Sequence, residues 1–208
     1  GNFVAGKTTD YTDEEFEAER NKIHEKLRTL ISICKQHHTA IRIGVNHGSL
    51  SPRIMNRYGD TPEGLTASCI ELLELCQLEN FHQIVISVKA SNTLVMVQAV
   101  RLLVQKMDAA GFHYPLHLGV TEAGEGEDGR IKSAIGIGGL LLDGIGDTIR
   151  VSLSEEPEAE IPVARLLVSY IGERAEAAAI QAVESTQYSR YEYIRRTTHA
   201  VGNIGGEN

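Results

Sequence analysis

The sequence predicts an α/β fold in which parallel strands alternate with helices, as in about half of an eight-stranded (β/α)8 barrel. Short apolar runs rich in β-branched residues are separated by amphipathic stretches of helical length. The starts of these runs lie about 32 to 43 residues apart, which suits successive βα units with generous loops. The predicted strands are Ile41–Val45, Ile84–Val88, Leu116–Val120 and Thr148–Leu153.

The first two helices have clear start signals. Thr12 followed by Glu15 predicts a capping box at the start of a helix that runs to about His37. Thr61 predicts the N-cap of the next helix, because Pro62 suits the first helical position. Both helices alternate with predicted strands, which is the order expected of a parallel sheet.

The later helices are predicted from caps and glycines. Ser91 or Asn92 caps a helix that Gly111 ends. A glycine-rich, apolar helix over about residues 130–143 is expected to be buried, and a final helix begins at about Val163. The glycine run at 136–139 lacks the spacing of a phosphate-binding loop, so close helix packing is the preferred interpretation; the run at 144–147 predicts a tight turn into the last strand.

Composition narrows the class of protein. The formal charge of −8 argues against a nucleic-acid binder, whose surface would be basic. No apolar run is long enough to span a bilayer, and the N-terminus does not resemble a signal peptide. Cys34, Cys69 and Cys76 match no zinc or iron–sulfur spacing and are expected to be buried thiols. These features predict a cytoplasmic protein, or one of the plastid stroma if it comes from a plant.

Positive side chains lie on the polar faces of the predicted strands. Because successive side chains of a strand alternate between faces, three strands each place one cation opposite an apolar face. The polar faces are Arg42, Gly44 and Asn46; Ser87, Lys89 and Ser91; and Thr148, Arg150 and Ser152. If helices cover the apolar faces, these cations converge inside the barrel, where they either bind a phosphate or pair with carboxylates or solvent.

The third strand carries a candidate carboxylate at its C-terminal end. His117, Gly119 and Thr121 share one face, and Glu122 follows just after the apolar run ends. Active sites of (β/α)8 barrels lie at this end of the strands, where a carboxylate can transfer protons. Glu122 has the wrong parity to point inward from the strand itself, so it must reach the site from the glycine-rich turn that follows; a solvated loop glutamate is the alternative.

At these strands the sequence resembles a known family. The segments 41–50, 87–91, 116–124 and 147–153 look like the characteristic strands of 4-hydroxy-3-methylbut-2-enyl diphosphate synthase, and Lys132–Gly136 also fits. The resemblance covers most of residues 1–168 and implies the C-terminal half of a TIM barrel. The form of residues 46–49 and 56–64 is similar to that of the longer members, which carry an extra inserted domain. Residues 1–170 are therefore predicted to be a partial substrate-binding barrel, and 171–208 a linker with the short helical start of that insert.

The resemblance implies an activity and its partners. Members of the family are oxidoreductases that reductively open 2-C-methyl-D-erythritol 2,4-cyclodiphosphate in non-mevalonate isoprenoid synthesis, with electrons from ferredoxin or flavodoxin. By motif position, Glu122 would be the acid–base residue, and the substrate-binding residues would be Arg42, Asn46, Lys89, Arg150 and Ser152. The family's 4Fe–4S cluster is bound by cysteines that this chain lacks, so the chain alone is expected to hold no cluster or other metal and to be inactive.

The sequence leaves two alternative functions open and also predicts an oligomeric state. A non-redox phosphate-binding barrel, such as a dihydropteroate-synthase-like transferase, would share the polar strand ends. A non-catalytic binding domain is a further alternative. Since half a barrel has exposed sheet edges, the chain is also expected to self-associate as a homodimer.

Overall fold

The computed structural model describes residues 10–175, 177, 197–201 and 206. The chain divides into two compact units, residues 1–175 and 176–208. Of the predicted linker and inserted-domain segment 171–208, most lies outside the described residues. The proposed boundary after residue 170 therefore stays a prediction. All of the named strands and helices belong to the first unit.

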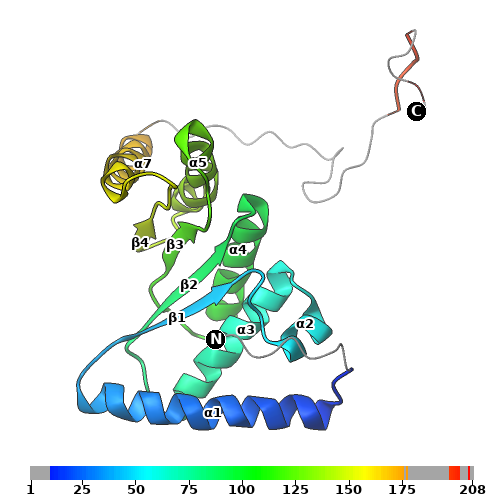
Figure 1. Cartoon of the computed structure of the whole chain (residues 1–208), viewed down its shortest axis with the longest axis vertical. Coiled ribbons are helices and arrows are strands. Elements are labelled where there is room, and N and C mark those ends of the chain that lie inside the picture. Colours follow the sequence, from blue (N-terminus) through cyan, green and yellow to red (C-terminus); the bar gives the residue numbers. More distant parts are fainter. Residues whose placement is uncertain (1–9, 176, 178–196, 202–205, 207–208) are drawn as a thin grey trace. The chain divides into compact units, whose positions relative to one another are not determined.

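The described strands form one parallel sheet in which neighbours in sequence are neighbours in space (Figure 1). The strands are β1 (Ile41–Asn46), β2 (Ile84–Ala90), β3 (His117–Val120) and β4 (Thr148–Arg150). The predicted α/β class and partial barrel are confirmed by this order of parallel strands and by the helices between them.

The fourth strand is shorter than the sequence predicts. It ends at Arg150 instead of Leu153, because the backbone beyond it is bonded elsewhere. The Leu153 amide donates to the Glu160 carboxylate at 3.1 Å, and the Ser154 amide donates to the Gly124 carbonyl at 3.0 Å. These bonds tie the segment after β4 to the turn that follows β3 and to the start of the last helix.

The early helices begin where the sequence predicts. Helix α1 (Asp13–Gln36) has the complete capping box of Thr12 and Glu15. Helix α3 (Pro62–Leu78) has Thr61 as its N-cap, and the Thr61 hydroxyl accepts from the Gly64 amide. Helix α4 (Thr93–Ala109) is capped by Asn92. A short helix that the sequence did not predict, α2 (Pro52–Tyr58), lies between β1 and α3.

The fourth predicted helix is not uniform. It consists of α5 (Gly126–Ser133), the π-helical turn η1 (Ala134–Gly138) and α6 (Gly139–Leu142). Its expected burial is only partial, because Ile137 and Leu140 are buried while other apolar side chains of this segment are exposed. A 3₁₀ turn, η2 (Pro157–Ala159), then leads into α7 (Glu160–Ala175), three residues before the predicted start at Val163.

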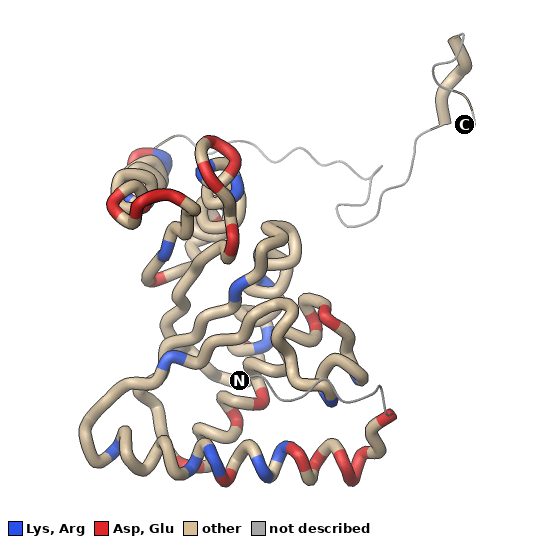
Figure 2. The backbone as a smooth tube through the Cα atoms, viewed as in Figure 1, with Lys and Arg blue, Asp and Glu red and all other residues tan. Residues whose placement is uncertain are grey.

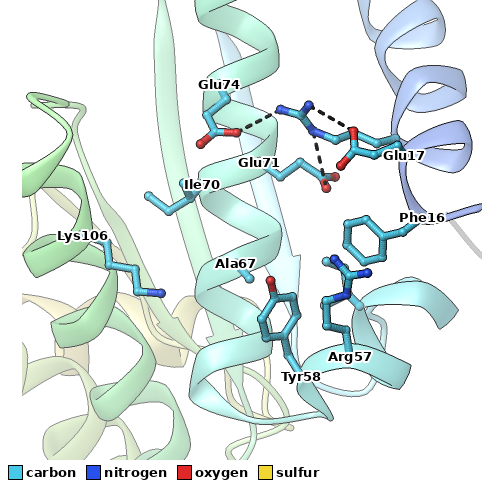
Figure 3. A pocket seen from close by; sticks show the side chains of 11 residues that line it. Phe16, Glu17, Arg57, Tyr58, Ala67, Ile70, Glu71, Glu74 and Lys106 are labelled. Atoms are coloured by element: carbon cyan, nitrogen blue, oxygen red, sulfur yellow. Dashed lines mark hydrogen bonds and ion pairs between the residues drawn. The ribbon is translucent and has the colours of Figure 1, made fainter. Parts of the chain in front are cut away.

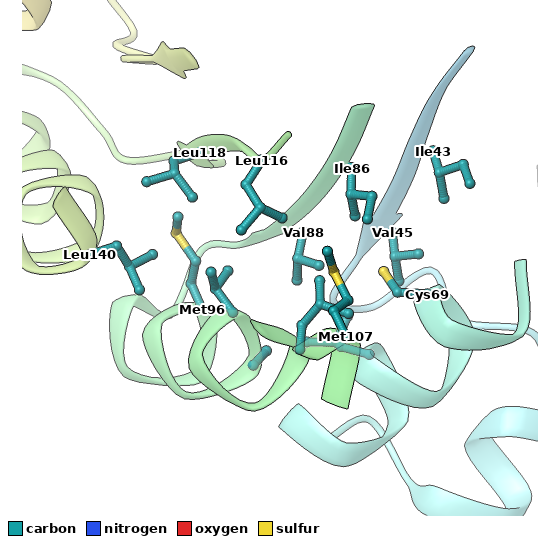
Figure 4. Close-up of a cluster of buried hydrophobic side chains, with 14 of the residues drawn as sticks. Ile43, Val45, Cys69, Ile86, Val88, Met96, Met107, Leu116, Leu118 and Leu140 are labelled. Atoms are coloured by element: carbon teal, nitrogen blue, oxygen red, sulfur yellow. The ribbon is translucent and has the colours of Figure 1, made fainter. Parts of the chain in front are cut away.

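The core lies between the sheet and the layer of helices that covers one of its faces. Helices α3 and α4 pack against each other and against β1 and β2, and η1 packs against β3 (Figures 1 and 4). Alternate strand residues such as Ile43, Ile86 and Leu118 are buried against helical residues such as Leu73 and Met96. This arrangement leaves the opposite, polar face of the sheet turned away from the helices.

The glycine run in η1 permits close packing on β3, as predicted. A Cβ at Gly136 would lie 2.5 Å from Val120 Cγ2 and 3.4 Å from Met96 Sδ. Changing Gly136 to Ala is therefore expected to lower the free energy of unfolding by about 1–3 kcal/mol, the usual cost of overpacking a core. Chemical denaturation followed by circular dichroism measures the effect.

The control for this change lies three residues further along the same helical segment. A Cβ at Gly139 meets nothing within 4 Å, so Gly139→Ala should leave stability unchanged or raise it by up to about 1 kcal/mol, as alanine favours helix. Equal destabilisation by both substitutions would contradict the packing argument.

None of the helices in the described part of the chain is long and apolar enough to cross a membrane.

Candidate functional site

Three of the predicted site residues lie in one row across the polar face of the sheet. Asn46 of β1 is in register with Lys89 of β2, Lys89 with Gly119 of β3, and Gly119 with Arg150 of β4. Neighbouring strands lie about 4.8 Å apart, so the row spans the sheet near the C-terminal ends of its strands. The side chains share a face because each occupies the same register position.

Gly119 leaves room for the two cations beside it. A Cβ at this position would lie 3.4 Å from Lys89 Cε and 3.1 Å from the Arg150 carbonyl oxygen. The lysine side chain therefore extends across β3 toward β4. Strand parity placed Gly119 on this face but could not show that the end of the Lys89 side chain lies against it.

The cations of this face repel one another. Burial, followed by the positive charges of Arg42 and Arg150, lowers the pKa of Lys89 below its ordinary value. Among the residues that the structure describes, no carboxylate lies within ion-pair distance of Arg42, Lys89 or Arg150. Positive charges gathered without a counter-charge are stabilised by an anion, which favours phosphate binding over internal ion pairs.

Acidic residues are concentrated elsewhere in this unit. Figure 2 shows them in α5 and in the segment that leads into α7, while α1 carries both signs. The net charge of −8 is therefore an average that does not describe the polar face. An anionic ligand meets a local positive potential at the row even though the whole chain would repel it weakly.

The remaining predicted binding residues lie at the two ends of this face. Arg42 is exposed on β1, four residues before Asn46, and its charge reaches both Lys89 and His117. Ser152 is half-buried and lies two residues beyond Arg150, past the end of β4. The structure thus aligns Asn46, Lys89 and Arg150, while Arg42 and Ser152 flank the row.

Glu122 lies in the turn after β3, where the backbone takes an unusual conformation. Its φ of 53° is in the left-handed region, which costs a residue other than glycine about 1 kcal/mol. The side chain is exposed. Backbone strain of this kind is common at functional sites, and Glu122 lies in the turn from which the sequence predicts it to act; its role at the site stays a prediction.

Ionic contacts hold this turn against the segment that follows β4. Arg130 of α5 donates to both carboxylate oxygens of Glu155, at 2.5 and 2.9 Å, and the Gly126 amide donates to the same carboxylate at 2.9 Å. The hydrogen bond from Arg130 lowers the pKa of Glu155, and the same bond raises that of Arg130. No sequence pattern indicated this contact, because the two residues are 25 positions apart. It links the loop that carries Glu122 to the strand that carries Arg150.

Comparison with known proteins identifies the family. The family model described as the GcpE TIM-barrel domain matches residues 4–165, which include every candidate site residue. The chain belongs to the GcpE family. The match places β1 to β4 within a GcpE barrel domain, as the resemblance implied.

Three similar relatives of this GcpE chain are named as 4-hydroxy-3-methylbut-2-en-1-yl diphosphate synthases, of the flavodoxin or the ferredoxin type. The 4-hydroxy-3-methylbut-2-en-1-yl diphosphate synthase (flavodoxin) of Parabacteroides distasonis is 62% identical over 210 residues, covering 99% of this chain and 34% of the relative. The flavodoxin-type synthase of Bacteroides thetaiotaomicron is 60% identical over 212 residues, covering 100% of the chain and 35% of the relative. The ferredoxin-type synthase of a Synechococcus species is 50% identical over 201 residues, covering 95% and 49%. The chain spans about a third to a half of the length of these curated relatives.

The cysteines of this GcpE chain are part of the core, as predicted. Cys34, Cys69 and Cys76 are free and buried, and burial raises the pKa of Cys69 to about 12 and that of Cys76 to about 11. A cysteine binds a metal as its thiolate, and such burial disfavours the thiolate form. Within the described residues no group of three His, Cys, Asp or Glu side chains could hold a metal ion. These cysteines therefore do not fit the iron–sulfur cluster that the resemblance implied.

A cavity of about 420 Å³ lies among helices α1 to α4 on the outer side of this GcpE unit (Figure 3). Both of its arginines are in ion pairs: Arg20 contacts Glu17, Glu71 and Glu74 of the lining, and Arg57 contacts Asp13 nearby. No strand residue lines it. Because its charges are mutually compensated, this cavity is a weaker candidate for an anion site than the polar face.

Proposed function

We propose that this chain carries the diphosphate-binding part of a 4-hydroxy-3-methylbut-2-enyl diphosphate synthase. The observation that carries the proposal is the row of Lys89 and Arg150, on which the charge of Arg42 also acts. None of these three cations has a carboxylate partner among the described residues. The names of the relatives support the assignment, and they give no support to the transferase alternative. The proposed substrate is 2-C-methyl-D-erythritol 2,4-cyclodiphosphate.

Each residue of the face has a distinct role in this proposal. Arg42, Lys89 and Arg150 neutralise the two linked phosphates; arginine can do so with two parallel hydrogen bonds and lysine with a compact charge. Asn46 and Ser152 supply neutral polar groups that orient the ligand. Glu122, at the C-terminal end of β3, exchanges a proton with the carbon skeleton or its leaving oxygen as the ring opens. An anion at this place also relieves the mutual repulsion of the cations.

The reduction itself is proposed to depend on groups beyond these residues. The electron donor would be the flavodoxin or ferredoxin that appears in the relatives' names. The 4Fe–4S cluster would be bound outside this chain, since its cysteines are buried in the core. We accordingly expect the chain alone to bind the cyclic diphosphate without turning it over. A cytoplasmic location and a homodimer remain part of the proposal.

Binding of the cyclic diphosphate to variants of this chain tests the proposal. Changing Lys89 or Arg150 to Ala is expected to weaken binding roughly 10- to 150-fold, the equivalent of about 1.5–3 kcal/mol for a hydrogen bond to a charged group. Isothermal titration calorimetry measures the dissociation constant. The matched control is Lys106→Ala, which removes an exposed cation from α4 and should leave affinity unchanged.

Unchanged affinity in both Lys89→Ala and Arg150→Ala would show that the ligand binds elsewhere. Equal weakening in Lys106→Ala would show that net charge, or the outer cavity that Lys106 lines, determines binding rather than the polar face. In either case the proposed site is wrong.

A further inference from the structure

A second layer of polar groups lies on the same face, two residues closer to the N-terminal ends of the strands. Since Lys89 is in register with Gly119, and Ile86 bridges to Leu116, Ser87 stands opposite His117. His117 in turn pairs with Thr148 of β4. Two residues of strand span about 6.6 Å, so this layer lies close beneath the row of Lys89 and Arg150.

The side chains of both layers lie on the same face of the sheet, but the second layer contains polar atoms without a hydrogen-bond partner in the part of the chain that the structure describes. The hydroxyl of Ser87 and Nε2 of His117 are buried without a hydrogen-bond partner among the described residues. Ser87 is only 2% exposed. A buried polar group without a partner costs about 1–3 kcal/mol, and such groups often mark a functional position. Their neighbours on this face are long, flexible cationic side chains, which can shift when a ligand binds.

The other side of the imidazole is held in place. Nδ1 of His117 lies 2.8 Å from the hydroxyl of Thr148, so the ring orientation is set and Nε2 remains available. Asp147, the carboxylate that precedes Thr148, accepts a hydrogen bond from the Leu116 amide at 2.7 Å. The charged groups that act on the ring are the cations of three neighbouring strands: Arg42 on β1, Lys89 on β2 and Arg150 on β4.

We propose that Ser87 and His117 form a second anion-binding layer of this face, in which the Ser87 hydroxyl and Nε2 of His117 bind a phosphate oxygen of the cyclic diphosphate. This inference rests on the proposed function, because it adds residues to the same site. It gives a role to two buried polar atoms that the row of Asn46, Lys89 and Arg150 leaves unexplained.

In this proposal, binding of the anion is coupled to protonation of His117. Burial, followed by the charges of Lys89, Arg42 and Arg150, lowers the pKa of His117 below 6.5, so the ring is neutral at neutral pH. A bound dianion compensates those charges and favours the protonated ring, which raises the pKa again. By linkage, the ligand is bound with uptake of a proton, and its affinity increases as the pH falls from the His117 pKa of the complex to the lower pKa of the free chain.

Histidine ring NMR spectra of the chain, recorded against pH with and without the cyclic diphosphate, test this coupling. We expect the His117 midpoint to lie below 6.5 in the free chain and to rise by about one pH unit or more when the ligand saturates the site. The cyclic ligand is a suitable probe because its phosphorus atoms carry only strongly acidic hydroxyls. A phosphate monoester would itself titrate near about pH 6.

Substitutions test the contacts separately from the titration. Ser87→Ala and His117→Phe are each expected to weaken binding about tenfold, while His117→Gln, which keeps a donor, should retain most of the affinity. The matched controls are Ser169→Ala, whose hydroxyl binds the Leu166 carbonyl on α7, and His113→Gln, an exposed histidine; neither should change binding. Thermal unfolding checks that each variant folds. If His117→Phe does not fold, Ser87→Ala, which removes only a hydroxyl, still tests the contact.

The outcomes separate this inference from the proposed function. If Lys89→Ala abolishes binding while the His117 midpoint and the affinity of Ser87→Ala do not change, the second layer is wrong and the proposed function stands. If Lys89→Ala and Arg150→Ala keep full affinity and the His117 midpoint does not move when the ligand is added, the proposed function fails. This inference then fails with it. A raised midpoint together with weakened binding in Ser87→Ala supports both.

Discussion

Changing Glu71 to Leu is expected to lower the free energy of unfolding by about 3–5 kcal/mol, because it leaves a buried arginine without its partner. Arg53 of α2 is 3% exposed, and its guanidinium donates to both carboxylate oxygens of Glu71 in α3. The same guanidinium lies over the ring of Phe16 in α1, 4.6 Å from its centroid. The ion pair therefore joins α2 and α3, and the ring contact adds α1, so an unpaired Arg53 would leave a charge buried among three helices of the outer layer.

The reverse substitution is expected to cost less. In Arg53→Met, Glu71 keeps a second cation, since Nε of Arg20 lies 3.9 Å from its carboxylate at the edge of the cavity (Figure 3). The double variant Arg53→Met/Glu71→Leu should recover most of the lost stability, because buried ion pairs can be replaced by apolar side chains of similar volume at little cost. Urea denaturation of the four proteins gives the coupling energy directly.

An exposed ion pair provides the control. Lys132 and Asp128 lie one turn apart on α5, with side chains 40% and 69% exposed, so Asp128→Asn should change stability by no more than about 0.5 kcal/mol. If Glu71→Leu costs less than about 1 kcal/mol, or if the double variant is as unstable as Glu71→Leu, then Arg53 is not held by this pair.

The polar face could be predicted because a strand has a period of two. Parity alone put Arg42, Lys89 and Arg150 on one side of the sheet, and the apolar residues between them required the helices to cover the other side. Thr12, Thr61 and the caps of later helices were equally local signals, so the starts of α1, α3 and α4 were predicted within a residue or two.

The features that the sequence could not supply depend on register and on long-range contacts. That Gly119 stands between Lys89 and Arg150 follows only from the pairing of β2, β3 and β4. The same is true of Ser87 and His117, whose unpaired atoms become visible only when their neighbours are known. Helix α2 was missed because its seven residues are too few to show a helical period. The close approach of Gly136 in η1 to Val120 is a long-range contact that no local pattern shows.

Changing Glu122 to Gln in a full-length protein that contains this chain is expected to lower kcat by about 100- to 10,000-fold, the usual contribution of a positioned acid–base group. Gln has the same shape and tolerates the same backbone, so the left-handed turn at φ 53° should be preserved. It cannot exchange a proton at neutral pH. The dissociation constant of the cyclic diphosphate should change little, because the cations of the row are untouched. Steady-state kinetics together with calorimetry separate the two quantities.

The matched control for Glu122 lies in the same turn. Glu125 is also exposed and acidic, and it precedes α5 without a side-chain capping bond, so Glu125→Gln should leave kcat within about threefold of the unmodified enzyme. If Glu122→Gln weakens ligand binding as strongly as it lowers kcat, its carboxylate positions the substrate rather than transferring a proton. If kcat is unchanged, Glu122 is a solvated loop residue.

A glycine at position 122 separates the role of the carboxylate from that of the backbone. Glycine adopts a positive φ without steric cost, so Glu122→Gly should keep the turn, which the Arg130–Glu155 ion pair and the bond from Ser154 to Gly124 also hold. If the carboxylate is the reacting group, Glu122→Gly loses activity as fully as Glu122→Gln while the protein unfolds at nearly the same denaturant concentration. A glycine variant that is active would mean that the strained backbone serves to shape the turn and that the proton comes from another group.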